Sequence, residues 1–240
     1  MPVKISFEQE IDQLVTQHIE QKIYYWGISL GSLCHTAMTL KRVKLKHFST
    51  PFDWIFSSPE VVTHMLNNNF QIFLDQSYYQ EVLKDEKLDN NANIAQHLYY
   101  LKHHHLKFMF NHHSPLTQKG YHYFERCVSR FRQVMHNKNP KLMLIMMQRQ
   151  ISKNEAEQLI NALNRFKTDY LLLIFSFIKK KESHTTTFKR LEIGYQHPQL
   201  FIIELPILGR TDGVVFSDPR DTYHLESLIK AFVQNPAFWV

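Results

Sequence analysis

The second half of the chain alternates short, uninterrupted apolar runs with amphipathic segments. Three apolar runs, at residues 141–148, 169–178 and 200–206, have the length and composition of buried strands. Two other segments, at 154–166 and 223–233, carry apolar residues at helical spacing instead. Fully apolar strands that alternate with helices are typical of a parallel sheet that is covered on both faces. The pattern therefore predicts an α/β protein, a three-layer sandwich with a mostly parallel sheet.

The first half adds one further strand and the elements around it. The expected elements are a polar helix at 5–21, a strand at 23–31, a helix from Cys34 and a Pro-containing loop at 47–58. Ser58 and Pro59 suit the N-cap and the first position of another helix, because serine caps free backbone N–H groups and proline lacks one.

Residues 77–140 are rich in Tyr, His, Asn and Lys and interrupt this alternation. Only the segment that starts at Gly120 shows clear helical spacing of its apolar residues. We therefore expect a single α/β domain over residues 1–240, in which 77–140 forms a helical insertion.

Composition narrows the classes of function. A chain of 240 residues that is 44% apolar is long enough to bury a core. The net charge of +6 is scattered along the chain, so nucleic-acid binding is not expected. No apolar run is long enough to cross a bilayer, and the first residues lack a signal-peptide pattern. Two cysteines cannot form a disulfide framework, so we expect a cytoplasmic protein without a membrane span.

Cys34 is the leading candidate for a catalytic nucleophile. It follows a predicted strand and the Gly31 turn, so it lies near a helix N-terminus at the carboxyl edge of the sheet, where α/β folds bind ligands. The helix dipole and free N–H groups there would lower the pKa of the thiol. The N–H groups after Gly31, including that of Ser32, would bind an oxyanion. The alternative is a buried cysteine that packs as a small apolar residue, which is our interpretation of Cys127 in mid-helix.

Asp221 and His224 form the second candidate site. They are three residues apart at the start of the last predicted helix, so the carboxylate can orient the imidazole as in a catalytic triad. The alternative is that Asp221 caps the helix and His224 is a surface residue.

The histidines of the inserted segment supply a third candidate. His103–His105 and His112–His113 are clustered, but thiolate or carboxylate ligands at regular spacing are missing, so neither a metal nor a cofactor is expected. The functional hypothesis is that one of them acts as general base toward Cys34. In the nearby segment S-T-P-F-D-W the aromatic residues are expected to anchor a loop, and Asp53 is a candidate charge that lines the pocket.

Three motifs stand close together: S-L-G-x-x-C, x-x-A-x-x-L and S-x-P-F-D-W. Their matches are Ser29, Leu30, Gly31, Cys34, Ala37, Leu40, Ser49, Pro51, Phe52, Asp53 and Trp54. With these motifs the sequence resembles the bacterial DUF1796 family, described as papain-like cysteine peptidases. The resemblance implies that Cys34 is the nucleophile. The family tends to show a His–Asp pair, to which His112 contributes the His, while His113 stands where the Asp would be.

A weaker resemblance is to SGNH or GDSL-type esterases and acyltransferases. The block Gly27–Leu30 is similar to G-D-S-L, with an isoleucine in place of the acid. This resemblance implies that Ser29 or Cys34 attacks an acyl group and that His224, oriented by Asp221, activates the nucleophile.

Three functions stay open on the sequence alone. The first is a hydrolase or acyltransferase that forms an acyl-enzyme on Cys34 with a small-molecule, peptide or glycan substrate. The second is an esterase-like O-acyltransferase that acts on a glycan. The third is a catalytically inactive protein that binds a glycan or an anion. In each, Ser29, Gly31, Ser32 and Asp53 are the expected substrate-binding residues, and the oligomeric state is left open.

Overall fold

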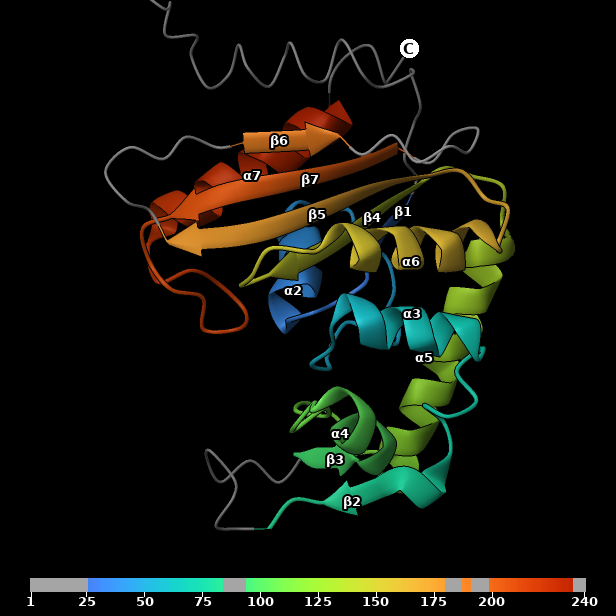
Figure 1. Ribbon diagram of the computed structural model, residues 1–240. Helices are drawn as coiled ribbons and strands as arrows, with labels where there is room; N and C mark the ends of the chain where they lie inside the picture. Colours follow the sequence, from blue (N-terminus) through green and yellow to red (C-terminus); the bar gives the residue numbers. More distant parts are fainter. Residues whose placement is uncertain (1–25, 84–93, 180–186, 191–198, 235–240) are drawn as a thin grey trace, which may run out of the picture.

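The computed structural model describes residues 26–83, 94–179, 187–190 and 199–234 (Figure 1). The strands are β1 (Trp26–Ser29), β2 (Tyr79–Glu81), β3 (Ala95–His97), β4 (Lys141–Met147), β5 (Tyr170–Lys179), β6 (Thr187–Arg190) and β7 (Gln199–Ile207). The helices are α2 (Cys34–Arg42), α3 (Pro59–Asn67), α4 (Leu98–His104), α5 (Gln118–His136), α6 (Lys153–Asn164) and α7 (Pro219–Gln234), with a 3-10 turn at Gln76–Tyr78. The helix expected at 5–21 lies outside the described residues.

Five strands form the main sheet, in the order β1-β4-β5-β7-β6. The first four of these are parallel to one another, and β6 pairs with β7 in the antiparallel direction. The prediction of an α/β sandwich with a mostly parallel sheet is confirmed. The edge strand β6 was not anticipated, because its four residues carry no apolar run.

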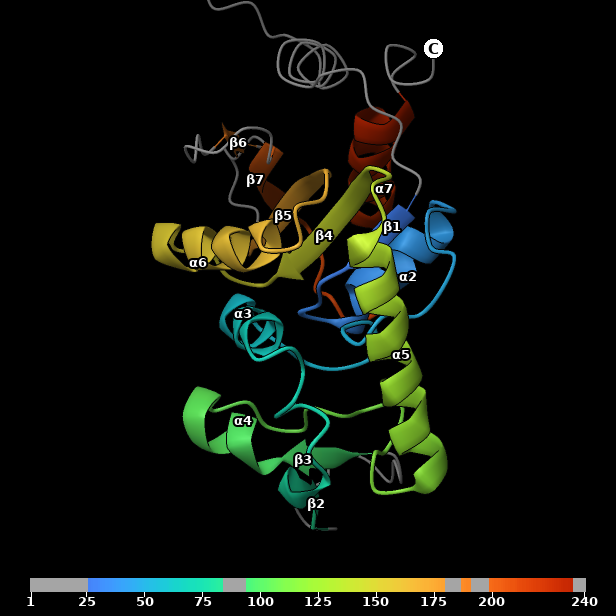
Figure 2. The same cartoon turned by 90° about the vertical axis from the view of Figure 1, so that its right-hand side faces the viewer.

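Each strand contributes alternate residues to two separate cores, because side chains of a strand point to opposite faces. On one face the sheet packs against α2 and α7, and on the other against α3, α5 and α6 (Figure 2). In β4, for example, Leu142 and Leu144 belong to the first core, whereas Met143 and Ile145 belong to the second. Burial on both faces explains why these strands are mostly apolar, with Lys141 and Ser176 as buried polar exceptions.

The inserted segment contains α4, α5 and a two-stranded antiparallel sheet of β2 and β3, and this small sheet was not anticipated. Phe110 links the segment to the rest of the chain by an isolated bridge to Ile55, and it forms a second bridge to Ala95 within the segment. Its aromatic core residues, such as Tyr100 and Phe124, belong to the same hydrophobic cluster as the second face of the main sheet. This shared core supports the single-domain prediction, which stays a prediction.

The N-terminal ends of two helices follow directly from the sequence. Ser58 accepts a hydrogen bond from the N–H of Val61, as expected of the N-cap before Pro59. Ser152 and Glu155 form a reciprocal capping box at the start of α6. These caps fix where α3 and α6 begin, at the carboxyl edge of the sheet.

Gly31 makes the turn between β1 and α2 with a φ of +89°. A Cβ at this position would lie 2.0 Å from the Oγ of Ser57, which approaches from the following loop. Both the backbone conformation and the close contact therefore require glycine. Gly213 also has a positive φ, of +96°, but a Cβ there would meet nothing within 4 Å.

We predict that Gly31→Ala lowers the free energy of unfolding by more than Gly213→Ala does. Both variants put alanine at a positive φ, which costs about 1 kcal/mol, but only the first also creates a clash. We expect a loss of about 1 kcal/mol for Gly213→Ala and at least about 2 kcal/mol more for Gly31→Ala. Urea unfolding of the two variants measures the difference, and equal losses would contradict the tight packing at Gly31.

Candidate functional site

Cys34 is the first residue of α2, directly after the β1 turn. The preceding N-cap residue, Leu33, provides no side-chain hydrogen bond, and the first turn of α2 contains no acidic residue. The positive end of the helix dipole is therefore available to a thiolate or an oxyanion. The thiol is only 3% exposed, however, and burial raises its pKa to about 11. The expected lowering of this pKa was wrong for the thiol as it lies here, because desolvation outweighs the helix terminus.

The three other residues expected around the nucleophile are tied into the turn. The Oγ of Ser29 accepts a hydrogen bond of 3.2 Å from the N–H of Gly31. The hydroxyl of Ser32 donates to the carbonyl oxygen of Met146 at 2.8 Å, which joins the turn to the end of β4. These bonds hold the chain that leads into Cys34 against the carboxyl edge of the sheet.

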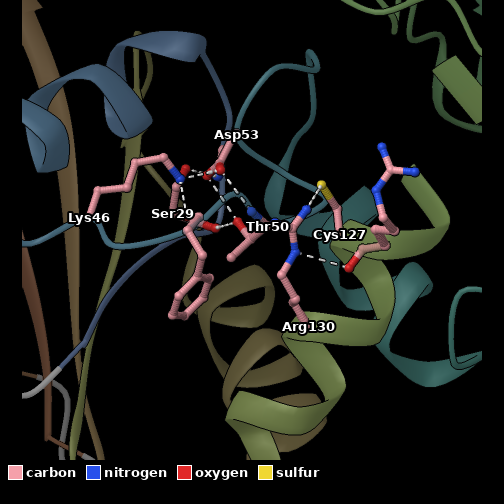
Figure 3. A network of polar contacts seen from close by, with 9 residues as sticks. Ser29, Lys46, Thr50, Asp53, Cys127 and Arg130 are labelled. Carbon is pink, nitrogen blue, oxygen red and sulfur yellow. Dashed lines mark hydrogen bonds and ion pairs between the residues drawn. The ribbon is translucent and has the colours of Figure 1, made fainter. Parts of the chain in front are cut away.

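Asp53 is fully buried and accepts hydrogen bonds on both carboxylate oxygens. Lys46 forms an ion pair with Oδ2, and Thr50 donates its N–H to Oδ2 at 2.7 Å and its hydroxyl to Oδ1 at 2.9 Å. The Thr50 hydroxyl also lies 3.3 Å from the carbonyl oxygen of Ser29 (Figure 3). Burial raises the pKa of Asp53, and Lys46 and Thr50 act against that rise. The carboxylate therefore braces the S-x-P-F-D-W loop against β1.

Lys46 was missed at the level of sequence. It stands in a run of lysines, and nothing in the spacing separates it from the exposed Lys44. Its role depends on the loop folding back so that a lysine seven residues earlier meets the carboxylate of Asp53.

Cys127, interpreted as a packing residue, lies closer to this network than the sequence indicated. Arg130, one turn along α5, donates to its sulfur at 3.3 Å (Figure 3). Burial raises the pKa of Cys127, while Tyr123 and Arg130 act in the lowering direction. The charge of Asp53 acts on the thiols of both Cys127 and Cys34. The fold thus brings both cysteines of the chain into the electrostatic range of one carboxylate.

His112 and His113 pack on the same side of the molecule as the S-x-P-F-D-W loop. The ring of His112 packs edge-on against that of Trp54, with 5.3 Å between the ring centroids. The ring centroids of His113 and Tyr123 are 4.0 Å apart. Burial lowers the pKa of His112, so its imidazole is neutral at pH 7 and able to accept a proton. Within the described part of the chain, the Cys34 sulfur has no hydrogen bond to an imidazole.

Asp221 lies at the start of α7, and its carboxylate binds backbone. It accepts the N–H of Leu208 on both oxygens, at 3.0 and 2.9 Å, and the N–H of Gly209 at 2.8 Å. These bonds hold the loop that follows β7. His224 is half-buried one turn further along α7. The carboxylate that was expected to orient His224 thus fixes this loop, a role that the D-x-x-H spacing does not indicate, and the pairing of Asp221 with His224 stays a prediction.

His35 is a buried residue that the sequence did not single out. Its side chain is 0% exposed, its Nδ1 lies 3.0 Å from the hydroxyl of Thr211, and its ring packs edge-on against Phe216. Its Nε2 has no hydrogen-bond partner among the described residues. Burial lowers the pKa of His35 to about 4. The loop after β7 therefore covers the start of α2, and the imidazole of His35 is neutral and buried under this loop.

The remaining candidate histidines lie on or beside α4. The ring of His103 packs on Tyr99 and that of His104 on Tyr100, while His105 ends the helix in the left-handed conformation. Among the residues that the structure describes, no three His, Cys, Asp or Glu side chains are grouped so as to hold a metal ion.

The fold and the site define an α/β protein with a cysteine at the carboxyl edge of a parallel sheet. The chain belongs to the DUF1796 family, whose model matches residues 26–178 and whose description reads "Putative papain-like cysteine peptidase". The first resemblance is thereby confirmed, and nothing supports the weaker one to SGNH-type esterases. No curated protein and no solved structure matches the chain.

Every helix within the described ranges is too short or too polar to cross a lipid bilayer.

We predict that Lys46→Met destabilises the protein far more than Lys153→Met. Removal of Lys46 leaves the fully buried Asp53 without its ion-pair partner, which typically costs about 3 kcal/mol or more. Lys153 pairs with Glu157 at 3.6 Å on the surface, where its side chain is 76% exposed, so its loss should cost less than about 0.5 kcal/mol. Urea unfolding checks both values, and similar small losses would show that the buried pair does not brace the loop.

We predict that His35 makes the protein less stable in acid. A pKa of about 4 in the folded state lies below the ordinary histidine value of 6.5, so the unfolded chain binds more protons between these pH values. Stability should therefore fall as the pH drops from about 6.5 to about 4, by at most about 3 kcal/mol from this residue. His35→Gln should flatten this fall, whereas the exposed His47→Gln should leave it unchanged. Parallel curves for all three proteins would contradict the prediction.

Proposed function

We propose that the protein is a cysteine hydrolase in which Cys34 attacks the carbonyl carbon of a peptide bond. The C–N bond breaks, the amine leaves with the proton that the general base took from the thiol, and water then hydrolyses the thioester to a carboxylic acid and free Cys34. The observation that carries the proposal is the position of Cys34 as the first residue of α2, at an uncapped helix N-terminus on the carboxyl edge of the sheet. Such a terminus stabilises both a thiolate and the oxyanion of a tetrahedral intermediate. Membership of a family described as cysteine peptidases supports the choice of the thiol as nucleophile.

His112 is our first choice for the general base. Its ring contacts Trp54, the neighbour of the Asp53 whose charge acts on Cys34. Its lowered pKa keeps it ready to accept a proton at neutral pH. His224 remains the alternative base. Asp53 then serves as a positioning residue, since its carboxylate is fully used in holding Lys46 and Thr50.

The structure corresponds to a resting state in this proposal. A thiol that is 3% exposed with a pKa of about 11 is protonated at pH 7 and cannot attack a carbonyl. Substrate binding has to expose the sulfur and bring it to an imidazole. The substrate class that fits the family description is a peptide, and transfer of the acyl group to an acceptor other than water is the variant reaction.

A second candidate function is ligand binding without catalysis. The burial of Cys34, and the absence of an imidazole hydrogen bond to its sulfur within the described residues, favour a family member that keeps the fold but does not react. The same helix terminus would then bind an anion or a glycan carboxylate.

We predict that a peptide with an activated ester, Ac-Ala-Ala p-nitrophenyl ester, acylates the protein at Cys34, because its peptide part supplies the substrate contacts that expose the sulfur. Intact-mass measurement followed by peptide mapping should find the adduct in the wild type, in Cys127→Ser and in Ser29→Ala, and should not find it in Cys34→Ala. Cys127 is the matched internal thiol, because it too is buried and has a raised pKa.

Three results would decide against the acyl-enzyme on Cys34. An adduct that survives in Cys34→Ala but is lost in Ser29→Ala would transfer the chemistry to the serine. An adduct that forms equally on Cys127 would show unselective labelling of thiols. The absence of any adduct in folded protein, with both thiols labelled only after unfolding, would favour the binding function.

A further inference from the structure

Helices α3 and α6 lie side by side on the face of the sheet opposite α2 and α7 (Figures 1 and 2). A polar groove is lined by residues of these two helices and by Arg165, which follows α6. Its volume is about 470 Å³, within the range of cavities that bind small ligands. Its lining residues are Thr63, Asn67, Gln158, Asn161, Ala162 and Arg165. None of these residues belongs to the site around Cys34.

The buried wall of the groove contains an unpaired hydroxyl. Thr63 is only 7% exposed, and its Oγ1 has no hydrogen-bond partner among the described residues. A buried hydroxyl without a partner costs free energy. This oxygen is covered by protein atoms, so it lies behind the lining of the groove and is not itself open to a ligand.

The exposed walls offer side-chain amides with unused hydrogen-bonding capacity. The amide of Asn161 has no partner within the described residues, and Gln158 has only a 3.4 Å contact of its Nε2 with Asn154. Arg165 directs one nitrogen, Nη1, at the backbone and side-chain oxygens of Asn67, at 3.3 and 3.1 Å. The other two guanidinium nitrogens have no protein acceptor in the described part of the chain, so the cation can still bind a carboxylate.

We propose that this groove binds an extended peptide segment and holds a carboxylate of that peptide at Arg165. A primary amide offers one acceptor and two donors, so Asn67, Gln158 and Asn161 can pair with the C=O and N–H groups of a peptide backbone. The lining contains no carboxylate to hold a cation. It also contains no aromatic ring, on which the apolar face of a sugar would stack.

The groove and Cys34 lie toward opposite edges of the sheet. Arg165 follows the last turn of α6, shortly before β5 begins, and so marks the amino edge of the strands. Cys34 follows the carboxyl end of β1. A peptide in the groove is therefore held away from the thiol. Its binding does not rest on the proposed function, although a peptidase could use it to hold a polypeptide substrate at a second point.

The test is a titration of the full chain with the acetylated tetrapeptide Ac-Ala-Ser-Ala-Ala, followed by ligand-observed NMR. The free carboxylate form should bind more tightly than its C-terminal amide. Arg165→Gln should remove this preference, and Gln158→Leu should weaken binding about three- to tenfold, as expected for the loss of one or two hydrogen bonds. Gln133→Leu is the matched control, because Gln133 is an exposed glutamine on α5, and it should bind as the wild type does.

Thr63→Val removes the unpaired buried hydroxyl with a side chain of the same shape. This variant should keep or gain thermal stability and should bind the peptide as the wild type does, because the hydroxyl lies behind the lining of the groove. Cys34→Ala should bind the peptide as the wild type does, which separates the groove from acyl transfer. The proposal fails if the peptide does not bind, if Gln158→Leu and Gln133→Leu behave alike, or if maltotriose binds the groove and the peptide does not.

Discussion

A parallel sheet that is buried on both faces leaves polar chemistry only at its edges. Most buried positions of β4, β5 and β7 are filled by apolar side chains of the two cores. The buried Lys141 at the start of β4 is an exception, and its ammonium group donates hydrogen bonds to the carbonyl oxygens of Asn137 and Asn139 and to the hydroxyl of Thr168. The candidate site residues lie in the loops at the carboxyl edge. Cys34, Asp53 and Asp221 all lie in segments that leave or approach this edge, and each is held by the chain around it.

Two opposing electrostatic effects meet at Cys34. A helix N-terminus stabilises a negative charge by about 0.3–1 kcal/mol, and by about 2 kcal/mol in favourable buried geometries. The rise of the pKa from 9.0 to about 11 corresponds to about 3 kcal/mol in favour of the neutral thiol. Desolvation therefore wins while the sulfur is covered. A movement that exposes the sulfur to water or substrate would remove the desolvation, and the unchanged helix N-terminus would then favour the thiolate.

The two buried carboxylates near the carboxyl edge have hydrogen-bond or ion-pair partners. Asp53 lies at 0% exposure beside Lys46 and Thr50, and Asp221 lies at 3% exposure with three backbone N–H contacts. Each carboxylate fixes a loop that has no regular secondary structure to hold it. His35 differs, since one ring nitrogen has a partner and the other has none among the described residues, so its burial favours the neutral form.

The sequence alone determined the layered architecture, because short unbroken apolar runs that alternate with amphipathic segments are typical of parallel strands covered on both faces. It also located the start of α3 through Ser58, since capping acts between residues three apart in the chain, and located α6 through its amphipathic spacing. The motif around Cys34 further indicated the family.

Contacts between distant residues were decided by the tertiary structure alone. The pairing of Lys46 with Asp53, the approach of Cys127 to the same carboxylate and the burial of His35 beneath Thr211 depend on how loops and helices pack. The periodicity of the sequence does not predict these contacts. The pKa and the partners of a lysine, cysteine or histidine depend on its burial and on the charges around it, which only the folded structure determines. The pKa of the Cys34 thiol was likewise decided by the tertiary structure. The sequence predicted the helix terminus, which lowers this pKa, but the fold buries the sulfur, and the desolvation outweighs the effect of the helix terminus.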